Sequence, residues 1–96
     1  MEHKFERLSD EIYIEVSAEH TFGTDALLLA YFASPKNNDR AMDMGTGCGI
    51  IPFLWLRNSK QSPVHCLDIQ QNAIEQVKRS IERNALQGRL VPHLCD

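Results

Sequence analysis

Three glycines at alternate positions, Gly45, Gly47 and Gly49, restrict the fold of this sequence more than any other feature. They follow a short apolar segment that contains Asp43, and they precede a segment of helical pattern that begins at Ile50. Glycine adopts backbone angles that are closed to other residues, and it leaves bare main chain against which a ligand can lie. A strand, a glycine turn and a helix in this order predict a βα unit of a parallel sheet with a candidate binding loop.

The spacing of the glycines indicates which ligand the loop suits. A dinucleotide site of the G-x-G-x-x-G type would need a third glycine where this sequence has Ile50. The observed D-x-G-x-G-x-G pattern instead sets the carboxylate of Asp43 at the end of a strand, where a cationic amino group could sit. We therefore expect a ligand with an ammonium group and no pyrophosphate, which disfavours a nicotinamide-dependent oxidoreductase. A tight turn without a ligand is the alternative.

The remaining sequence alternates between extended and helical patterns. The predicted elements are a strand at 12–16 that follows a turn from an earlier short strand, a helix at 24–33, a strand at 40–44, a helix from 50 to about 57, a strand at 64–69, a helix from 70 to about 86 and a strand at 90–95. The βαβαβ order predicts a parallel sheet with right-handed crossovers. Pro92 predicts that the last strand lies at a sheet edge, which gives the order 3-2-1.

The predicted helices carry recognisable end and face signals. Thr24 is the expected N-cap of the first helix, and Asp25 in its first turn suits the positive end of the helix dipole. The last helix is amphipathic. Its apolar stripe comprises Ile74, Val77, Ile81 and Ala85, and its solvated face comprises Glu75, Lys78, Arg79, Glu82 and Arg83.

Two further aspartates close neighbouring strands. Asp68 ends the second strand of the parallel sheet, where an acidic residue binds ribose hydroxyls in nucleotide-binding folds. The alternative for Asp68 is that it caps the helix that follows. Asp96 closes the third strand and could accept a hydrogen bond from an adenine amino group, with a surface aspartate near the chain end as the alternative.

Composition and charge exclude several other classes of protein. The formal net charge of −3 creates no general attraction to nucleic acid or anionic membrane. We find no signal peptide and no segment long enough to span a bilayer. The three cysteines form no CxxC pair, so we expect reduced thiols in a cytoplasmic protein.

Isolated histidines and cysteines offer weaker signals. His65, Cys66, His93 and Cys95 suggest a zinc site, but successive residues of a strand point to opposite faces, so the four ligands would not converge. Cys48 in the glycine loop stands near a helix N-terminus, which could lower the pKa of its thiol, although no base accompanies it. We therefore expect no metal site.

Three segments together resemble a known family. Thr21–Ala30, Asp43–Ile50 and Leu67–Ile69 look like successive motifs of the small-domain class I methyltransferases, and most of all like the bacterial enzymes that methylate an adenine amino group in a valine tRNA. The resemblance covers residues 5–96, and its Gly-Thr-Asp-Ala-Leu-Leu-Leu segment is more specific than the glycine motif. It implies a Rossmann-like fold, S-adenosylmethionine as cofactor and an RNA partner, with a β-hairpin and a helix before the 3-2-1 half of a 3-2-1-4-5-7-6 sheet.

The resemblance also implies a set of cofactor-binding residues. These are Gly45, Thr46 and Gly47 along the methionine and ribose, Asp43 near the amino group, Asp68 on the ribose hydroxyls, Ile69 against the adenine, Asp96 beside the adenine amine, and Thr24 and Asp25 at the methionine end. Helix capping is the competing interpretation of the last two.

The family's catalytic signature, a tetrapeptide like Asn-Pro-Pro-Tyr, is absent from this sequence. We therefore expect residues 1–96 to form the N-terminal, cofactor-binding part of one methyltransferase domain, without catalytic residues. Related enzymes that modify rRNA guanine or protein glutamine share the same front motifs, and a non-catalytic nucleotide-binding or interaction module is a further alternative. The strand at 40–44 would present an open sheet edge, so we expect either self-association of the chain through that edge or a protein that is longer than this sequence.

Overall fold

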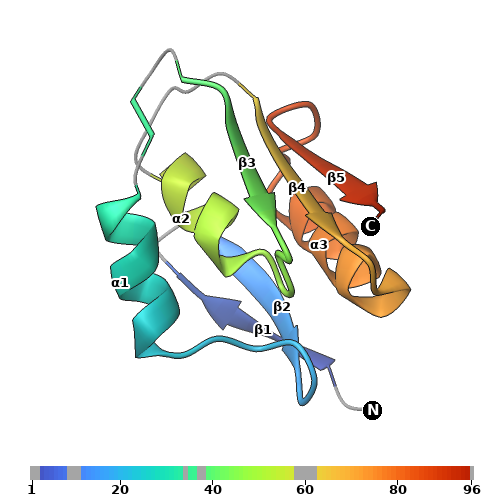
Figure 1. Cartoon of the computed structure of the whole chain (residues 1–96). Helices are drawn as coiled ribbons and strands as arrows, with labels where there is room; N and C mark the ends of the chain where they lie inside the picture. The colour runs from blue at the N-terminus through green and yellow to red at the C-terminus, as the bar shows by residue number, and fades with distance from the viewer. Residues whose placement is uncertain (1–2, 9–11, 34, 37–38, 58–62, 96) are drawn as a thin grey trace.

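A parallel sheet of three strands forms the centre of the structure, a computed structural model that describes residues 3–8, 12–33, 35–36, 39–57 and 63–95 (Figure 1). In chain order the elements are β1 (His3–Arg7), β2 (Tyr13–Ser17), α1 (Thr24–Phe32), β3 (Ala41–Met44), α2 (Ile50–Arg57), β4 (Val64–Asp68), α3 (Gln71–Arg83) and β5 (Leu90–Leu94). β1 and β2 pair separately as an antiparallel hairpin, and the parallel strands are ordered β3-β4-β5. The chain is therefore an α/β protein.

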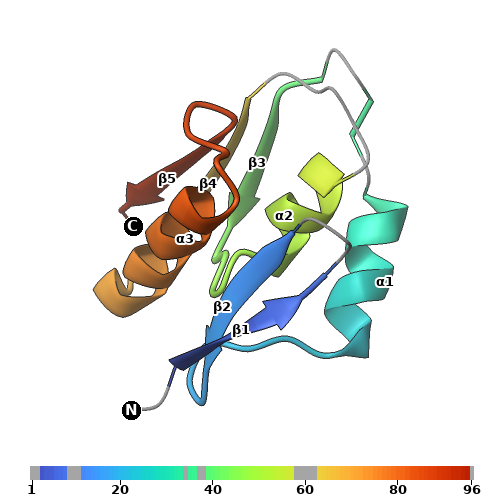
Figure 2. The same cartoon turned by 180° about the vertical axis from the view of Figure 1, so that it is seen from behind.

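Both crossover helices cover the same face of this sheet. The crossovers through α2 and α3 run in the same direction across the sheet, and right-handed crossovers then place their helices on one side. The alternation of burial agrees, because Val64 and Cys66 of β4 are fully buried under the helices. Met42 and Met44 of β3 point to the other face and are exposed. In Figure 2 the hairpin lies on the side of the helices that faces away from the parallel sheet, with β2 beside α3.

The two edges of the parallel sheet differ in their backbone groups. The Val64 N–H donates to the Arg89 carbonyl (2.9 Å) and the Cys95 N–H donates to the Asp68 carbonyl (3.1 Å), so odd-numbered residues of β5 turn their backbone toward β4. Even-numbered residues then face outward, and Pro92 among them has no N–H. The edge at β5 therefore cannot pair with another strand as a complete ladder.

The edge at β3 is open by the same argument. The Gly45 N–H donates to the Leu67 carbonyl (2.9 Å), so odd-numbered residues face β4 and the backbone of Met42 and Met44 faces outward. No proline interrupts this strand, and the Met44 side chain beside it is 74% exposed. β3 is thus the edge of this sheet that can accept a further strand.

Side chains of α3 pair with the free backbone edge of β2. The Tyr13 N–H donates to Oδ1 of Asn84 (2.8 Å), and the Tyr13 carbonyl accepts from the same amide group. The Glu15 N–H donates to Oγ of Ser80 (2.8 Å), and its carbonyl accepts from Nε2 of Gln76 (3.2 Å). These three polar residues are four apart in sequence, so they form one row along α3 that takes the place of a neighbouring strand.

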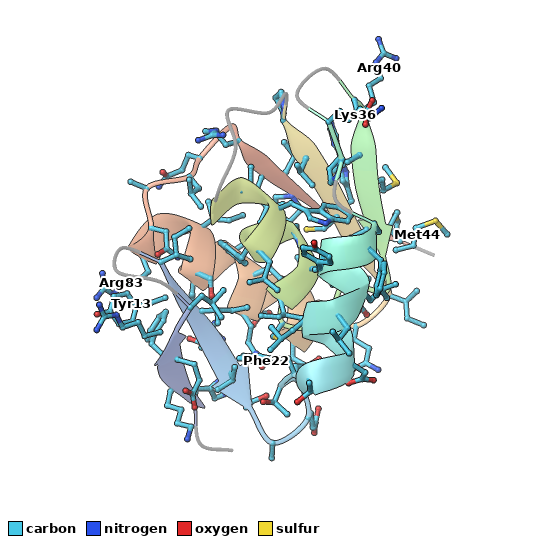
Figure 3. The ribbon with its side chains drawn as sticks, turned by 90° about the vertical axis from the view of Figure 1, so that its left-hand side faces the viewer. Tyr13, Phe22, Lys36, Arg40, Met44 and Arg83 are labelled. Atoms are coloured by element: carbon cyan, nitrogen blue, oxygen red, sulfur yellow. The ribbon has the colours of Figure 1, made fainter. Side chains whose placement is uncertain are left out.

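Charged side chains reinforce this contact between the hairpin and α3. Arg79 donates through Nε and Nη2 to the two carboxylate oxygens of the buried Glu15 (2.8 and 2.6 Å), and Nδ1 of His3 lies 3.0 Å from the same carboxylate. The hydrogen bond from Arg79 is the main reason why the pKa of Glu15 is lowered, against the opposing effect of burial. The guanidinium of Arg83 lies 4.5 Å above the ring of Tyr13 (Figure 3).

Several local predictions were wrong. Gly23, not Thr24, is the N-cap of α1, and no side chain caps that helix. Ala85 lies beyond the end of α3 with a φ of 53° and does not extend its apolar stripe, and Arg79 pairs with Glu15 where we expected only solvent. The turn that we predicted before the strand at 12–16 falls largely outside the described residues. Within the described ranges, no helix is long and apolar enough to cross a membrane.

The row of polar side chains on α3 makes a prediction about stability. Gln76 is fully buried, accepts from Oγ of Ser17 (2.6 Å) and donates to the carbonyls of Glu15 and His20. Gln76→Leu leaves these groups without partners, and we expect it to lower the free energy of unfolding by about 3 kcal/mol. Urea unfolding measures the change, with Gln71→Leu on the exposed side of the same helix as control. Equal effects of the two substitutions would contradict this role.

Candidate binding site at the glycine loop

The glycine loop joins β3 to α2 and is held by backbone hydrogen bonds to β4. The N–H groups of Gly45 and Thr46 both donate to the Leu67 carbonyl (2.9 and 3.0 Å), and the Gly49 N–H donates to the Thr46 carbonyl (2.9 Å). Gly45 and Gly47 have φ angles of 71° and 56°, which L side chains rarely adopt. The loop is therefore a defined structure at the carboxyl end of the sheet, where ligands bind in open α/β folds.

Asp68 connects this loop to the next one. Its Oδ2 accepts a hydrogen bond from the Gly47 N–H (3.0 Å), and its Oδ1 accepts one from the Gln70 N–H (2.9 Å) just before α3. This second bond is a turn before the helix and not a cap, because Gln70 is the N-cap of α3 and no side chain caps that helix. The alternative that Asp68 caps the helix was therefore wrong, and its carboxylate instead contacts both loops. Because an ionised carboxylate has about four lone-pair positions, Asp68 keeps acceptor capacity for ligand hydroxyls.

Asp43 is the second carboxylate of the site and is only partly exposed. Its Oδ2 accepts a hydrogen bond from Oγ1 of Thr46 (2.7 Å). Burial raises the pKa of Asp43, the hydrogen bond from Thr46 opposes this rise, and the nearby charge of Asp68 adds to it. Two carboxylates at the same sheet edge create a negative potential that favours a cationic ligand.

Thr46 differs from the two glycines beside it. We expected all three to lie along the ligand, but the Thr46 side chain is 5% exposed and turns inward to Asp43. At Gly45 and Gly47, by contrast, an added Cβ would meet no atom within 4 Å. The open space beside the bare main chain is what a ligand lying along this loop requires, so the loop fits the methionine and ribose part of S-adenosylmethionine.

The other expected cofactor residues are placed less closely together. Ile69 follows Asp68 and is 66% exposed, which leaves an apolar side chain free beside the carboxylate. Thr24 and Asp25 are exposed on the first turn of α1, and no hydrogen bond or ion pair among the described residues joins them to the glycine loop. Asp96 lies outside the described residues.

The cysteines and histidines have structural surroundings. Burial raises the pKa of the Cys48 thiol and outweighs the lowering effect of the backbone at the start of α2. Nδ1 of His65 lies 2.9 Å from Nε2 of His93 on the neighbouring strand, while Cys66 is buried and Cys95 is exposed. Within the described ranges, no group of three or more His, Cys, Asp or Glu residues could hold a metal ion.

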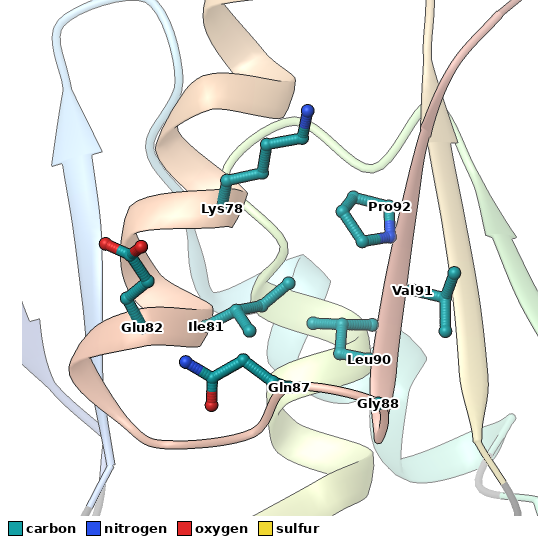
Figure 4. Close-up of a pocket in the computed structure, with 8 residues that line it drawn as sticks. All are labelled: Lys78, Ile81, Glu82, Gln87, Gly88, Leu90, Val91 and Pro92. Carbon is teal, nitrogen blue, oxygen red and sulfur yellow. The ribbon is translucent and has the colours of Figure 1, made fainter.

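A second hollow lies away from this site. It is a groove of about 420 Å³ between α3 and β5, and in Figure 4 Leu90 and Pro92 point into it, whereas Val91 points away from α3. Its lining is mostly apolar and includes the turn at Gln87 and Gly88, which precedes β5. The groove is therefore at the amino end of β5, and Asp43 and Asp68 do not line it.

The parallel sheet and the glycine loop between β3 and α2 define a fold of the Rossmann-like α/β class. The methyltransferase small domain family matches residues 17–94. Because this match covers most of the sequence, the chain belongs to that family, as its motifs indicated.

Curated relatives include several RNA methyltransferases. The chain is 35% identical over 69 residues to the tRNA1(Val) (adenine(37)-N6)-methyltransferase of Christiangramia forsetii, which covers 71% of this chain and 29% of that protein. It is 33% identical over 60 residues to the enzyme of the same name from Pasteurella multocida, covering 62% and 25%. It is 31% identical over 70 residues to the ribosomal RNA small subunit methyltransferase C of Shewanella denitrificans, covering 73% and 19%. The matched region thus spans less than a third of each relative.

Solved structures show the same fold. The tRNA m1G37 methyltransferase of M. jannaschii superposes with a TM-score of 0.73 at 24% identity, over 98% of this chain and 30% of that one. TrmK of M. capricolum, in complex with S-adenosyl-homocysteine, superposes with a TM-score of 0.67 at 21% identity, over 80% and 33%. At these identities the likeness establishes the Rossmann-like fold alone.

Two groups near the site were not expected from the sequence. The buried Cys66 lies near the Thr46 side chain, and the Gln70 N–H donates a hydrogen bond to one oxygen of Asp68. Cys66 lies near the site because the parallel β3–β4 register pairs it directly with Asp43. The pattern of residue types alone did not define that register.

Gly49 offers a prediction that separates steric contact from backbone strain. Its φ is 86°, and an added Cβ would lie 3.1 Å from the Phe53 ring and 3.2 Å from Val77. Gly88 has a similar φ of 83° with nothing within 4 Å, so it carries the strain alone. We expect Gly88→Ala to destabilise the fold by about 1 kcal/mol and Gly49→Ala by about 3 kcal/mol. Thermal unfolding compares the two, and indistinguishable losses would show that Phe53 and Val77 yield without cost.

Proposed function

We propose that this chain is the cofactor-binding part of an S-adenosylmethionine-dependent methyltransferase. The observation that carries the proposal is the contact between the Gly47 N–H and Asp68, which joins a bare glycine loop to a carboxylate at the carboxyl end of the sheet. Membership of the methyltransferase small domain family supports it. S-adenosylmethionine supplies an electrophilic methyl group on a sulfonium, and the chain's own residues bind and orient the rest of that molecule.

The roles of the individual residues follow from their chemistry. Gly45 and Gly47 would border the methionine and ribose, because their backbone faces open space. Asp68 would accept hydrogen bonds from the ribose hydroxyls, and Asp43 would face the ammonium group. Ile69 would pack against the adenine through its exposed apolar side chain. We keep Thr24, Asp25 and Asp96 as further candidates for the methionine and adenine ends.

For the parent protein we propose transfer of the methyl group to the exocyclic amine of adenine in tRNA. The named activity of the relatives from Christiangramia forsetii and Pasteurella multocida supports this acceptor. Ribosomal RNA is the second candidate acceptor, favoured by the relative from Shewanella denitrificans. Methyl transfer needs an acceptor positioned at near-attack distance, and an Asn-Pro-Pro-Tyr-like tetrapeptide is absent from this sequence. We therefore propose that residues 1–96 bind the cofactor without methylating RNA by themselves.

The cofactor assignment predicts the result of a calorimetric titration. We expect S-adenosylmethionine to bind the 96-residue chain, and Asp68→Ala to weaken binding at least about tenfold, because hydrogen bonds to a carboxylate are lost. Asp39→Ala is the control, since Asp39 is exposed and precedes the amino end of β3, whereas the glycine loop follows the carboxyl end. A folded chain that binds no cofactor, or that loses as much affinity with Asp39→Ala, would contradict the assignment.

The acceptor is tested with a full-length protein that contains this sequence. Labelled S-adenosylmethionine would be incubated with that protein and either total tRNA or ribosomal RNA, and the modified nucleoside identified after digestion. Label in N6-methyladenosine of tRNA is the expected result. Cofactor binding with label only in ribosomal RNA would select the second acceptor, and binding with no label in either RNA would refute an RNA acceptor.

We also propose that the 96-residue chain self-associates through the open edge of β3. The backbone of Met42 and Met44 faces outward there, and α1 adds exposed apolar side chains such as Tyr31 and Phe32. Antiparallel pairing of two β3 edges would satisfy these backbone groups. The variant Met42→Lys/Met44→Lys sets charges along the edge, and we expect it to sediment as a monomer when the wild type sediments as a larger species. A wild type that is monomeric at the same concentration would refute this proposal.

A further inference from the structure

The hydroxyl of Thr46 is committed to the protein. It is buried beneath the glycine loop and donates to Oδ2 of Asp43 at 2.7 Å. A hydroxyl group has a single hydrogen, so Thr46 has no donor left for a ligand. The second oxygen of Asp43 takes no part in this bond and remains as an acceptor.

Cys66 extends this contact into the core. It is fully buried, lies opposite Asp43 in the β3–β4 register, and is near the Thr46 side chain. Burial raises the pKa of the Cys66 thiol to about 12, so the thiol is protonated at neutral pH. The Cys66 thiol therefore adds no negative charge beside Asp43.

The hydrogen bond from Thr46 also favours the ionised form of Asp43. Three groups face the Asp43 carboxylate among the residues described: Thr46 on the loop, and Cys66 and Asp68 on β4. Burial and the charge of Asp68 both disfavour ionisation of Asp43, and the hydrogen bond from Thr46 alone opposes them.

We propose that Thr46 is a positioning residue, which holds one oxygen of Asp43 so that this carboxylate presents its other oxygen to the ammonium group of S-adenosylmethionine. This inference rests on the proposed cofactor function. It changes the role of Thr46 from a residue that touches the ligand to one that acts through Asp43.

The proposal determines how binding depends on pH. An ammonium ligand binds the ionised form of Asp43, so affinity falls as the pH drops through the pKa of that carboxyl. Thr46→Val removes the group that favours ionisation, which raises this pKa and moves the loss of affinity to higher pH. Thr46→Ser keeps the hydroxyl and should retain the wild-type profile.

Two measurements test this on the full chain. NMR of the side-chain carboxyl carbons follows the titration of Asp43 without ligand, in the wild type, Thr46→Val and Thr46→Ser. Calorimetry then follows S-adenosylmethionine affinity against pH. We expect an upward shift of the Asp43 pKa in the valine variant only, with affinity about tenfold weaker near that pKa and converging with the wild type at higher pH.

Each outcome decides between roles. An unchanged Asp43 pKa in Thr46→Val, or an equal loss of affinity at every pH, would overturn the positioning role. If the pKa of Asp43 is higher in Thr46→Val than in the wild type, but neither protein binds the cofactor, the Thr46–Asp43 coupling is supported and the proposed function is overturned. If Thr46→Val does not fold, the Asp43→Asn variant provides the test, because its affinity should be low and independent of pH over the range in which Asp43 titrates. A full pH dependence in Asp43→Asn would refute the proposal.

Discussion

The carboxylate of Asp68 holds two loops at the carboxyl end of the sheet in a fixed relation. One oxygen takes the Gly47 N–H from the loop before α2, and the other takes the Gln70 N–H before α3. Without the Asp68 carboxylate, this side-chain connection between the two βα loops would be lost. The arrangement combines an anchored main chain with open space over Gly45 and Gly47, so that the ligand surface is rigid before a ligand arrives. Pre-organisation of this kind reduces the ordering cost of binding.

Polar groups inside the protein maintain this surface from behind. The row formed by Gln76, Ser80 and Asn84 fastens the hairpin to α3 through the backbone of β2, so that no strand is needed on that side. The contact of Thr46 with Asp43 does the same for the loop. In both places a buried polar side chain satisfies a group that would otherwise be costly to bury. These hydrogen bonds, together with the burial of Ile14 and Val16 in the core, position the hairpin, and the Thr46–Asp43 bond positions the loop.

Apolar periodicity and glycine spacing were enough to predict the main elements, the glycine loop and the place of Asp68. They were not enough for contacts that depend on the relative placement of elements. Gln76 and Ser80 are polar residues within an amphipathic helix, and only the docked hairpin explains why they are buried. Gly23, and not Thr24, is the N-cap of α1, and no side chain caps that end of the helix. The preference of threonine for N-cap positions therefore did not identify where the helix begins. The inward direction of the Thr46 side chain follows from its hydrogen bond to Asp43, which residue types alone do not indicate.

The central claim is that the ligand lies on the loop that Asp68 anchors. Amide NMR spectra of the labelled chain, recorded while S-adenosylmethionine is added, test this most directly because they locate the ligand on the protein. The account predicts that the largest shifts fall on the amides of Gly45, Gly47 and Gln70, with little change in the α3–β5 groove. Shifts confined to that groove, or spectra that do not change at saturating cofactor, would contradict it.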